Sequence, residues 1–177
     1  MKKAIPLTLV LALTLASCLK KEEAANNNPS SSLSLDELVL DSAPDTALDI
    51  AILRKQAKAG DTVSFTGEVI GSDPVFLDGR AIMIVGDPKK ITACNKIPGD
   101  SCERPWDVCC DDPDVITASI VTVQVVDEEG KLVKKTLRGV GGVKELSTVT
   151  VTGEVAEGSN DSNMLINAAG IFVHPNS

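Results

Sequence analysis

The sequence "TVSFTGEV" at residues 62–69 is the clearest indication of the fold, because it returns almost unchanged as "TVTVTGEV" at residues 148–155. Both stretches alternate apolar and polar residues with a period of two, which predicts strands with one buried face. Each carries a glycine inside the strand, Gly67 or Gly153. Such glycines often mark a bulge or a barrel corner. We interpret the two stretches as strands of a closed barrel rather than as a duplication.

Similar patterns rich in Val, Ile and Thr recur along the chain, and these residues suit a pleated surface. Strands are predicted at residues 62–71, 80–86, 115–127, 131–139, 147–158 and 163–174. The period of two predicts that the inward-facing side chains include Val63, Phe65, Ile82, Ile84, Val149 and Val151. Six short strands and little helix predict a mainly β fold, a small barrel of five to six strands.

The run from Gly60 to Asp87, "GDTVSFTGEVIG" followed by "VFLDGRAIMIVGD", resembles the opening strands of secreted bacterial OB-fold proteins. The resemblance covers residues 60–174 and implies an OB-like barrel. In that fold a helix joins the third and fourth strands, and here "GGVKELST" (141–148) leaves room for about one turn. The "PWD-x-CC" motif at 105–110 is not part of this pattern. It is similar to a feature of secreted proteins of planctomycete type, and it implies no activity.

The chain begins "MKKAIPLTLVLALTLASC". The apolar run is shorter than the roughly 20 residues that span a bilayer, and it has the length of a signal-peptide core. Its end, Leu15 to Cys18, resembles the lipobox of bacterial lipoproteins. The resemblance implies cleavage of residues 1–17 and lipidation of Cys18 with diacylglycerol and a fatty acid such as palmitate. Leu19 then favours the outer over the inner membrane, so we expect a lipid-anchored protein on the periplasmic side of the cell envelope.

Three further segments follow the predicted signal peptide. Residues 18–33 are polar and predict a flexible tether that begins at the lipidated cysteine. Residues 34–60 predict a helical segment, with a capping box at Ser34 and Glu37 and a second helix that ends at Gly60. One face of that second helix carries Ala47, Ile50, Ala51 and Arg54. Residues 61–175 form the predicted barrel domain, with a Cys-rich loop at 87–115.

The charge of the chain argues against nucleic acid as a partner. Loss of residues 1–17 removes Lys2 and Lys3 from 17 basic residues and none of the 25 acidic residues, which leaves a net charge of −10. A nucleic-acid binder needs a basic surface and often stacking rings. This chain has three Phe, one Trp and no Tyr.

Four of the five cysteines lie close together at positions 94, 102, 109 and 110. An even number of cysteines in an exported domain predicts disulfides. A bond within the adjacent pair is disfavoured, because neighbouring Cα atoms are about 3.8 Å apart and disulfides usually span about 4.4–6.8 Å. We therefore expect Cys109 and Cys110 to bond to different partners and to staple a loop with little apolar content. The alternative is a metal site for a thiophilic ion such as copper(I), although the usual zinc spacing is absent.

Few other residues point to chemistry. Trp106 lies within the loop and predicts either local packing or an exposed contact for a partner. The acidic residues around it make calcium binding conceivable, but no EF-hand pattern is present. His174 is the only histidine and lies near the end of the chain. We expect no cofactor and no catalysis. The predicted function is a non-catalytic binding or scaffolding domain for an envelope protein or small ligand, with metal handling by the cysteines as the alternative.

Overall fold

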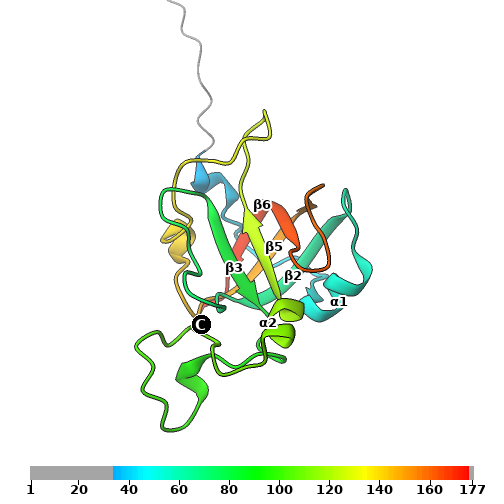
Figure 1. The fold of residues 1–177 in the computed structure, drawn as a ribbon. Helices are drawn as coiled ribbons and strands as arrows, with labels where there is room; N and C mark the ends of the chain where they lie inside the picture. Colours follow the sequence, from blue (N-terminus) through cyan, green and yellow to red (C-terminus); the bar gives the residue numbers. More distant parts are fainter. Residues whose placement is uncertain (1–33, 176–177) are drawn as a thin grey trace, which may run out of the picture. The chain divides into compact units, whose positions relative to one another are not determined.

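Six strands form one sheet in the computed structural model, which describes residues 34–175. They are β1 (Leu48–Asp49), β2 (Thr62–Glu68), β3 (Ile82–Gly86), β4 (Ile120–Gln124), β5 (Thr148–Val155) and β6 (Leu165–Val173). The strand order is β1-β2-β3-β4-β6-β5, and β5 pairs again with β2, which closes a five-stranded barrel (Figure 1). Within the barrel β4 and β6 run parallel and the other neighbours are antiparallel. The predicted mainly β, OB-like barrel is confirmed.

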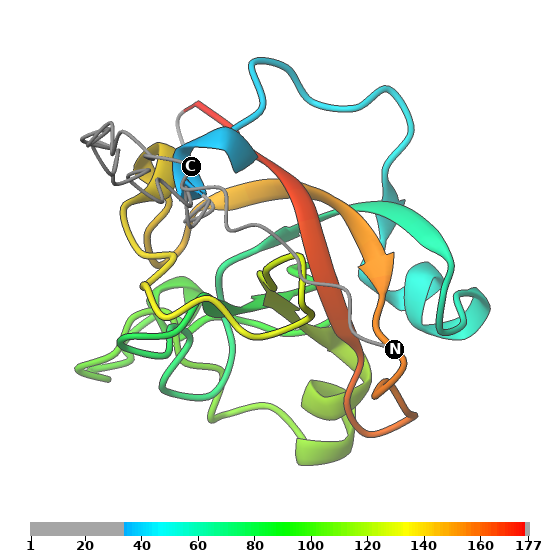
Figure 2. The same ribbon diagram turned by 90° about the horizontal axis from the view of Figure 1, so that it is seen from above.

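The inward faces of β2 and β5 agree with the predicted alternation. Val63, Phe65, Val149 and Val151 are buried, and Phe65 lies opposite Val151 in the sheet. Figure 2 shows β5 and β6 lying side by side across the barrel wall. These side chains belong to a core that all five barrel strands share.

The predicted register of β3 is wrong by one residue. Met83 and Val85 are fully buried, whereas Ile82 and Ile84 are only half-buried. Residues 82–85 are all apolar, so alternation gives no register there. The 69–81 loop pairs with the edge of β3, where Ile84 N–H donates to Val75 C=O at 2.8 Å. The same loop approaches the Ile84 side chain, because a Cβ on Gly71 would lie 2.8 Å from Ile84 Cγ2.

Both predicted strand glycines lie where a side chain would not fit. A Cβ on Gly153 would lie 2.3 Å from the backbone oxygen of Asn167, beside a shift in the β5–β6 register. A Cβ on Gly67 would lie 2.6 Å from Val85 and 2.7 Å from Ile50. Gly153 therefore permits the irregularity in the barrel wall, and Gly67 permits the close approach of the preceding helix.

The segment before the barrel packs on it, with details that differ from the predictions. It contains a 3-10 turn, η1 (Leu35–Leu38), and one helix, α1 (Ile50–Gln56). The Ser34 side chain makes no capping hydrogen bond, and α1 ends well before Gly60. Two residues of α1, Ile50 and Leu53, are fully buried in the barrel core.

Two of the predicted strands differ in the structure. Residues 115–119 of the predicted strand at 115–127 belong instead to helix α2 (Pro113–Ser119). Asp112 accepts hydrogen bonds from the backbone N–H groups of Asp114 and Val115, and a proline begins the helix. The predicted strand at 131–139 is reduced to one bridge between Val126 and Leu132. The one helical element in the connection between β4 and β5 is the short 3-10 turn η3 (Val140–Gly142), close to where the sequence leaves room for one turn.

Candidate functional site

The clustered cysteines lie on a long insertion between β3 and β4, the green segment at the lower left of Figure 1. The insertion has a 3-10 turn, η2 (Cys94–Lys96), and a small core of its own. That core consists of Ile70, Ile91, Ala93 and Val108, all buried. The expectation of a loop with little apolar content is therefore wrong. Ile70 lies just after β2, so this second core also fastens the insertion to the barrel.

Backbone hydrogen bonds bring the two limbs of the insertion together. Cys94 N–H donates to Asp107 C=O at 2.8 Å, and Asn95 N–H donates to Pro105 C=O at 3.0 Å. An ion pair of 3.2 Å between Arg104 and Asp73 ties the turn of the insertion to the 69–81 loop. These contacts place Cys94 beside Cys109.

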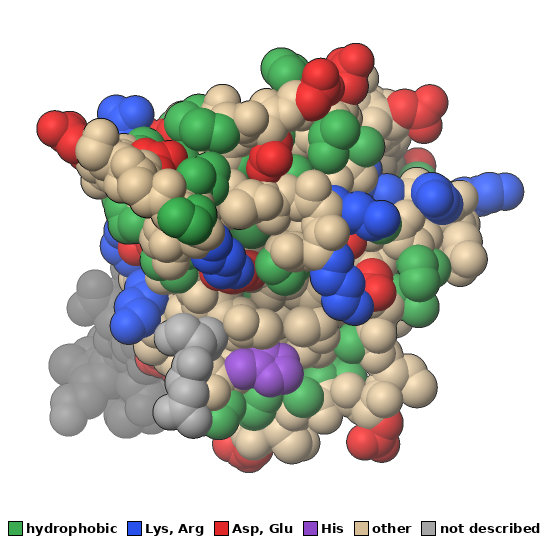
Figure 3. All heavy atoms as spheres, turned by 90° about the horizontal axis from the view of Figure 1, so that it is seen from below, with side chains coloured by type: hydrophobic (Ala, Val, Ile, Leu, Met, Phe, Trp, Pro, Cys, Tyr) green, Lys and Arg blue, Asp and Glu red, His purple; other side chains and the backbone are tan. Residues whose placement is uncertain are grey.

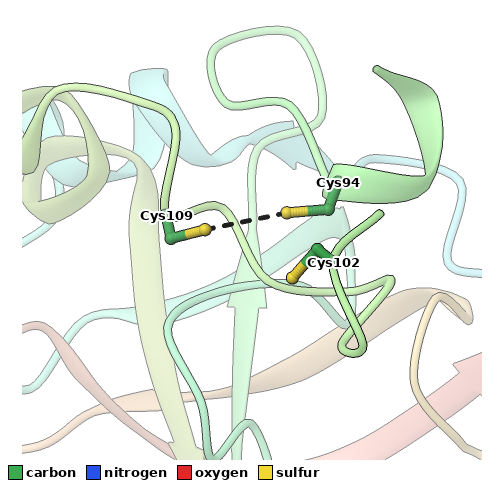
Figure 4. A group of neighbouring side chains, drawn as sticks. All are labelled: Cys94, Cys102 and Cys109. Carbon is green, nitrogen blue, oxygen red and sulfur yellow. Dashed lines mark hydrogen bonds between the residues drawn. The ribbon is translucent and has the colours of Figure 1, made fainter. Parts of the chain in front are cut away.

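The four thiols converge around Cys94. The Sγ atoms of Cys94, Cys102 and Cys109 all lie within 4.8 Å of one another. Figure 4 shows the Cys94 and Cys109 side chains pointing toward each other, with Cys102 beside them. The Sγ atoms of Cys94 and Cys110 lie within 4.8 Å of each other and of a carboxylate oxygen of Asp100. Cys94 is thus the common member of both groups. It is buried, Cys102 is half-buried, and Cys109 and Cys110 are exposed.

All four cysteines are free thiols in the structure. The Sγ atoms of Cys94 and Cys109 are 3.8 Å apart, whereas a disulfide bond is about 2.05 Å long. The predicted pair of disulfides is not formed here, and its connectivity stays a prediction.

The observed spacing has a direct chemical meaning for a metal ion. With Zn–S bonds of about 2.3 Å, two thiolates on a tetrahedral zinc ion lie about 3.8 Å apart. This is the distance between the sulfurs of Cys94 and Cys109. The thiols could also hold copper(I), which favours soft sulfur ligands. The side chains present therefore fit a thiophilic ion.

The same surroundings favour the protonated form of Cys94 and Cys110 when no metal is bound. Burial raises the pKa of Cys94, and hydrogen bonding to Cys102 and Cys109 adds to that effect. The charge of Cys109 raises the pKa of Cys110, as does a hydrogen bond between the two thiols. Because the thiolate is the nucleophilic form, these effects disfavour redox reactivity of the kind seen in low-pKa cysteines.

Trp106 joins the two cores rather than standing free. Its ring is half-buried and packs against both the barrel core and the core of the insertion. Its Nε1–H is buried and has no hydrogen-bond partner among the described residues. Packing therefore accounts for most of its position, and a partner contact through Trp106 stays a prediction.

The acidic residues near the cysteines mostly organise the backbone. Asp111 accepts a hydrogen bond from Thr92 N–H at 2.6 Å, and Asp107 accepts one from Val108 N–H at 2.7 Å. Asp112 caps α2. These roles leave the carboxylates spread through the loop rather than gathered around one point.

Of two other positions considered in the sequence, the structure describes His174 but not Cys18. His174 shares a hydrogen bond of 2.9 Å with the Thr150 hydroxyl and lies edge-on to Phe172, and nothing among residues 34–175 indicates catalysis. Cys18 and the predicted tether lie outside the described residues. Within the described part of the chain, no helix has the length and hydropathy needed to cross a bilayer.

A second feature, a cleft beside Arg54, is not evident from the sequence. The only signal was an arginine on the otherwise apolar face of the predicted helix.

Comparison of the chain with protein-family models, curated proteins and solved structures finds no match.

Proposed function

We propose that this protein is a non-catalytic binding module whose OB-like barrel presents a four-cysteine site for a thiophilic metal ion, zinc or copper(I). The convergence of the sulfurs of Cys102, Cys109 and Cys110 on Cys94 carries the proposal. Four thiolates would complete a tetrahedral site with no position left for substrate, which is the arrangement of non-catalytic zinc centres.

Two observations favour a bound ion that can be exchanged over one that is needed only for folding. Small structural zinc domains are unfolded without metal. Here the insertion is held by its own apolar core, by backbone hydrogen bonds and by the ion pair between Arg104 and Asp73. In addition, Cys109 and Cys110 are exposed, so an ion on the site can be reached from solvent.

We also propose that the module is anchored by lipid at Cys18, on the periplasmic side of the outer membrane. The order of basic residues, apolar run, small residues and cysteine at the start of the chain supports this location. A lipid anchor and a flexible tether would hold the metal site close to the membrane surface.

The test is metal analysis and thiol titration of the purified protein, prepared with and without reductant. We expect reduced protein to bind one zinc or copper(I) ion, and Cys94→Ser to abolish binding. Glu103→Gln is the matched control, because Glu103 is exposed in the same loop and belongs to neither ligand group. Absence of stoichiometric metal on the reduced protein would refute the proposal. So would disulfides that persist in protein isolated under native redox conditions, and they would restore the predicted stapled loop.

A further inference from the structure

A cleft of about 660 Å³ lies away from the cysteines, between α1, α2 and the turn that joins β5 to β6. Small side chains line its walls, among them Ala51 of α1 and Ala118 of α2. Val155 and Met164 contribute buried apolar surface to it. A volume of this size is typical of pockets that hold small organic ligands.

Arg54 is fixed at this cleft by backbone groups. Its Nη1 donates to Ile120 C=O at 2.8 Å, and its Nη2 donates to Asp161 C=O. Burial lowers the pKa of Arg54, an effect that the charge of Asp161 partly offsets. Arginine nevertheless stays charged in proteins. A half-buried guanidinium therefore lines the cleft with donors to spare.

Three lysines add to the positive charge around Arg54. Lys55, Lys58 and Lys90 all line the cleft, whereas only two acidic residues, Asp114 and Asp161, do so. The ion pairs within 4 Å among residues 34–175 use other cations, so the only acidic charge that acts on this group from nearby is that of Asp161 on Arg54.

The excess of basic over acidic residues around the cleft contrasts with the net charge of the whole domain. Residues 34–175 contain 13 basic and 23 acidic residues, a net charge of −10. Figure 3 shows basic and acidic side chains interspersed on the face drawn there. A group of cations around an apolar cleft is thus a distinct feature of this domain.

We propose that the cleft binds a small amphiphilic carboxylate, such as a medium-chain fatty acid. The carboxylate would pair with Arg54 through the N–H groups that its two backbone hydrogen bonds leave free, and the lysines would add long-range attraction. The apolar body would lie against Val155, Met164 and the alanines. A neutral ligand would leave the cations unused, and a cationic one would be repelled.

Isothermal titration calorimetry of the full chain with decanoate tests this inference. Decanol and decyltrimethylammonium are the neutral and cationic probes of matched chain length. We expect decanoate to bind at least about tenfold more tightly than decanol, a difference of about 1.4 kcal/mol. Equal affinities for decanoate and decanol, or no decanoate binding at millimolar concentration, would overturn the proposal.

Variants separate the cleft from the rest of the surface. Replacing both Lys55 and Lys58 by Gln should weaken decanoate binding several-fold, and both side chains are exposed, so the fold should be retained. Lys134→Gln with Lys135→Gln is the matched control, because this exposed pair does not line the cleft. Ala118→Phe should fill the cleft and abolish binding.

The proposal fails if the Lys55 and Lys58 variant binds as the Lys134 and Lys135 variant does and Ala118→Phe binds as the unmodified chain does. Cys94→Ser should leave decanoate binding unchanged, because no cysteine lines the cleft. The carboxylate site and the proposed metal site are therefore tested independently.

Discussion

Replacing Met83 and Ile82 by Ala, one at a time, tests the register of β3 and with it the barrel core. Met83 is fully buried, lies opposite Val123 of β4 and forms a bridge with Phe76. Removing such a side chain costs about 2–5 kcal/mol, because the loss of apolar burial is added to the cavity that remains. Ile82 is half-buried, so its truncation should cost about half as much or less.

The two variants should therefore separate clearly in stability. A domain of about 150 residues loses about 2–4 °C of melting temperature per kcal/mol, so a cost of about 2–5 kcal/mol for Met83→Ala should lower the midpoint by about 4–20 °C. Urea unfolding followed by far-ultraviolet circular dichroism gives the free energy of unfolding of each variant. A larger loss for Ile82→Ala than for Met83→Ala would refute the observed register, because a shift of one residue exchanges the two faces of the strand.

Three further predictions concern the barrel wall, the metal site and the N-terminus. Gly153→Ala should lower the free energy of unfolding in urea by about 1–3 kcal/mol, because its Cβ would collide with the Asn167 backbone. Gly158→Ala is the control: its Cβ would lie 3.4 Å from Leu165, so the free energy of unfolding should change by less than about 0.5 kcal/mol. Zinc affinity, measured by competition with a chelator between pH 6 and 8, should rise about tenfold per pH unit for each thiol proton displaced, and a flat profile would contradict thiolate ligation. Cys18→Ala should release the protein from membranes or leave it unprocessed, and mass spectrometry that finds residue 18 unmodified in the native protein would exclude the anchor.

Alternation of residues predicted the barrel well where it was clear and poorly where it was not. In β2 and β5 polar residues separate the apolar ones, so Phe65 and Val151 were assigned inward correctly. In β3 four apolar residues follow one another, and only the position of the 69–81 loop decides which pair faces the core. The sequence of this loop shows no pattern that predicts where it lies against β3.

Local capping signals carried more information than periodicity at α2. The Val- and Ile-rich residues from 115 onward favour a strand, yet Asp112 and Pro113 begin a helix there and the strand starts only at Ile120. The "DPD" at 112–114 is the signal that predicts this start, because an aspartate cap and a proline in the first turn are typical of helix N-termini.

The candidate site was predictable in its members but not in its geometry. Four cysteines within 17 residues identify a cluster, and their spacing is compatible with bridges or with a metal. Which outcome the loop favours depends on contacts distant in sequence, such as the packing of Ile70 against Val108. The cleft was harder still, since its walls come from α1, α2 and the β5–β6 turn, and only tertiary packing brings them together.

The insertion is folded in this structure without a disulfide bond, and this bears on the role of its cysteines. A disulfide stabilises chiefly by constraining an unfolded chain, so it contributes most where other contacts are weak. This insertion already has a buried core, paired limbs and an ion pair to the 69–81 loop. Its thiols are therefore not required to hold it in place. The sulfurs of Cys94 and Cys109 lie 3.8 Å apart, which is close to the separation of two sulfurs on one zinc ion. A site that is organised before its ion arrives loses little conformational entropy on binding.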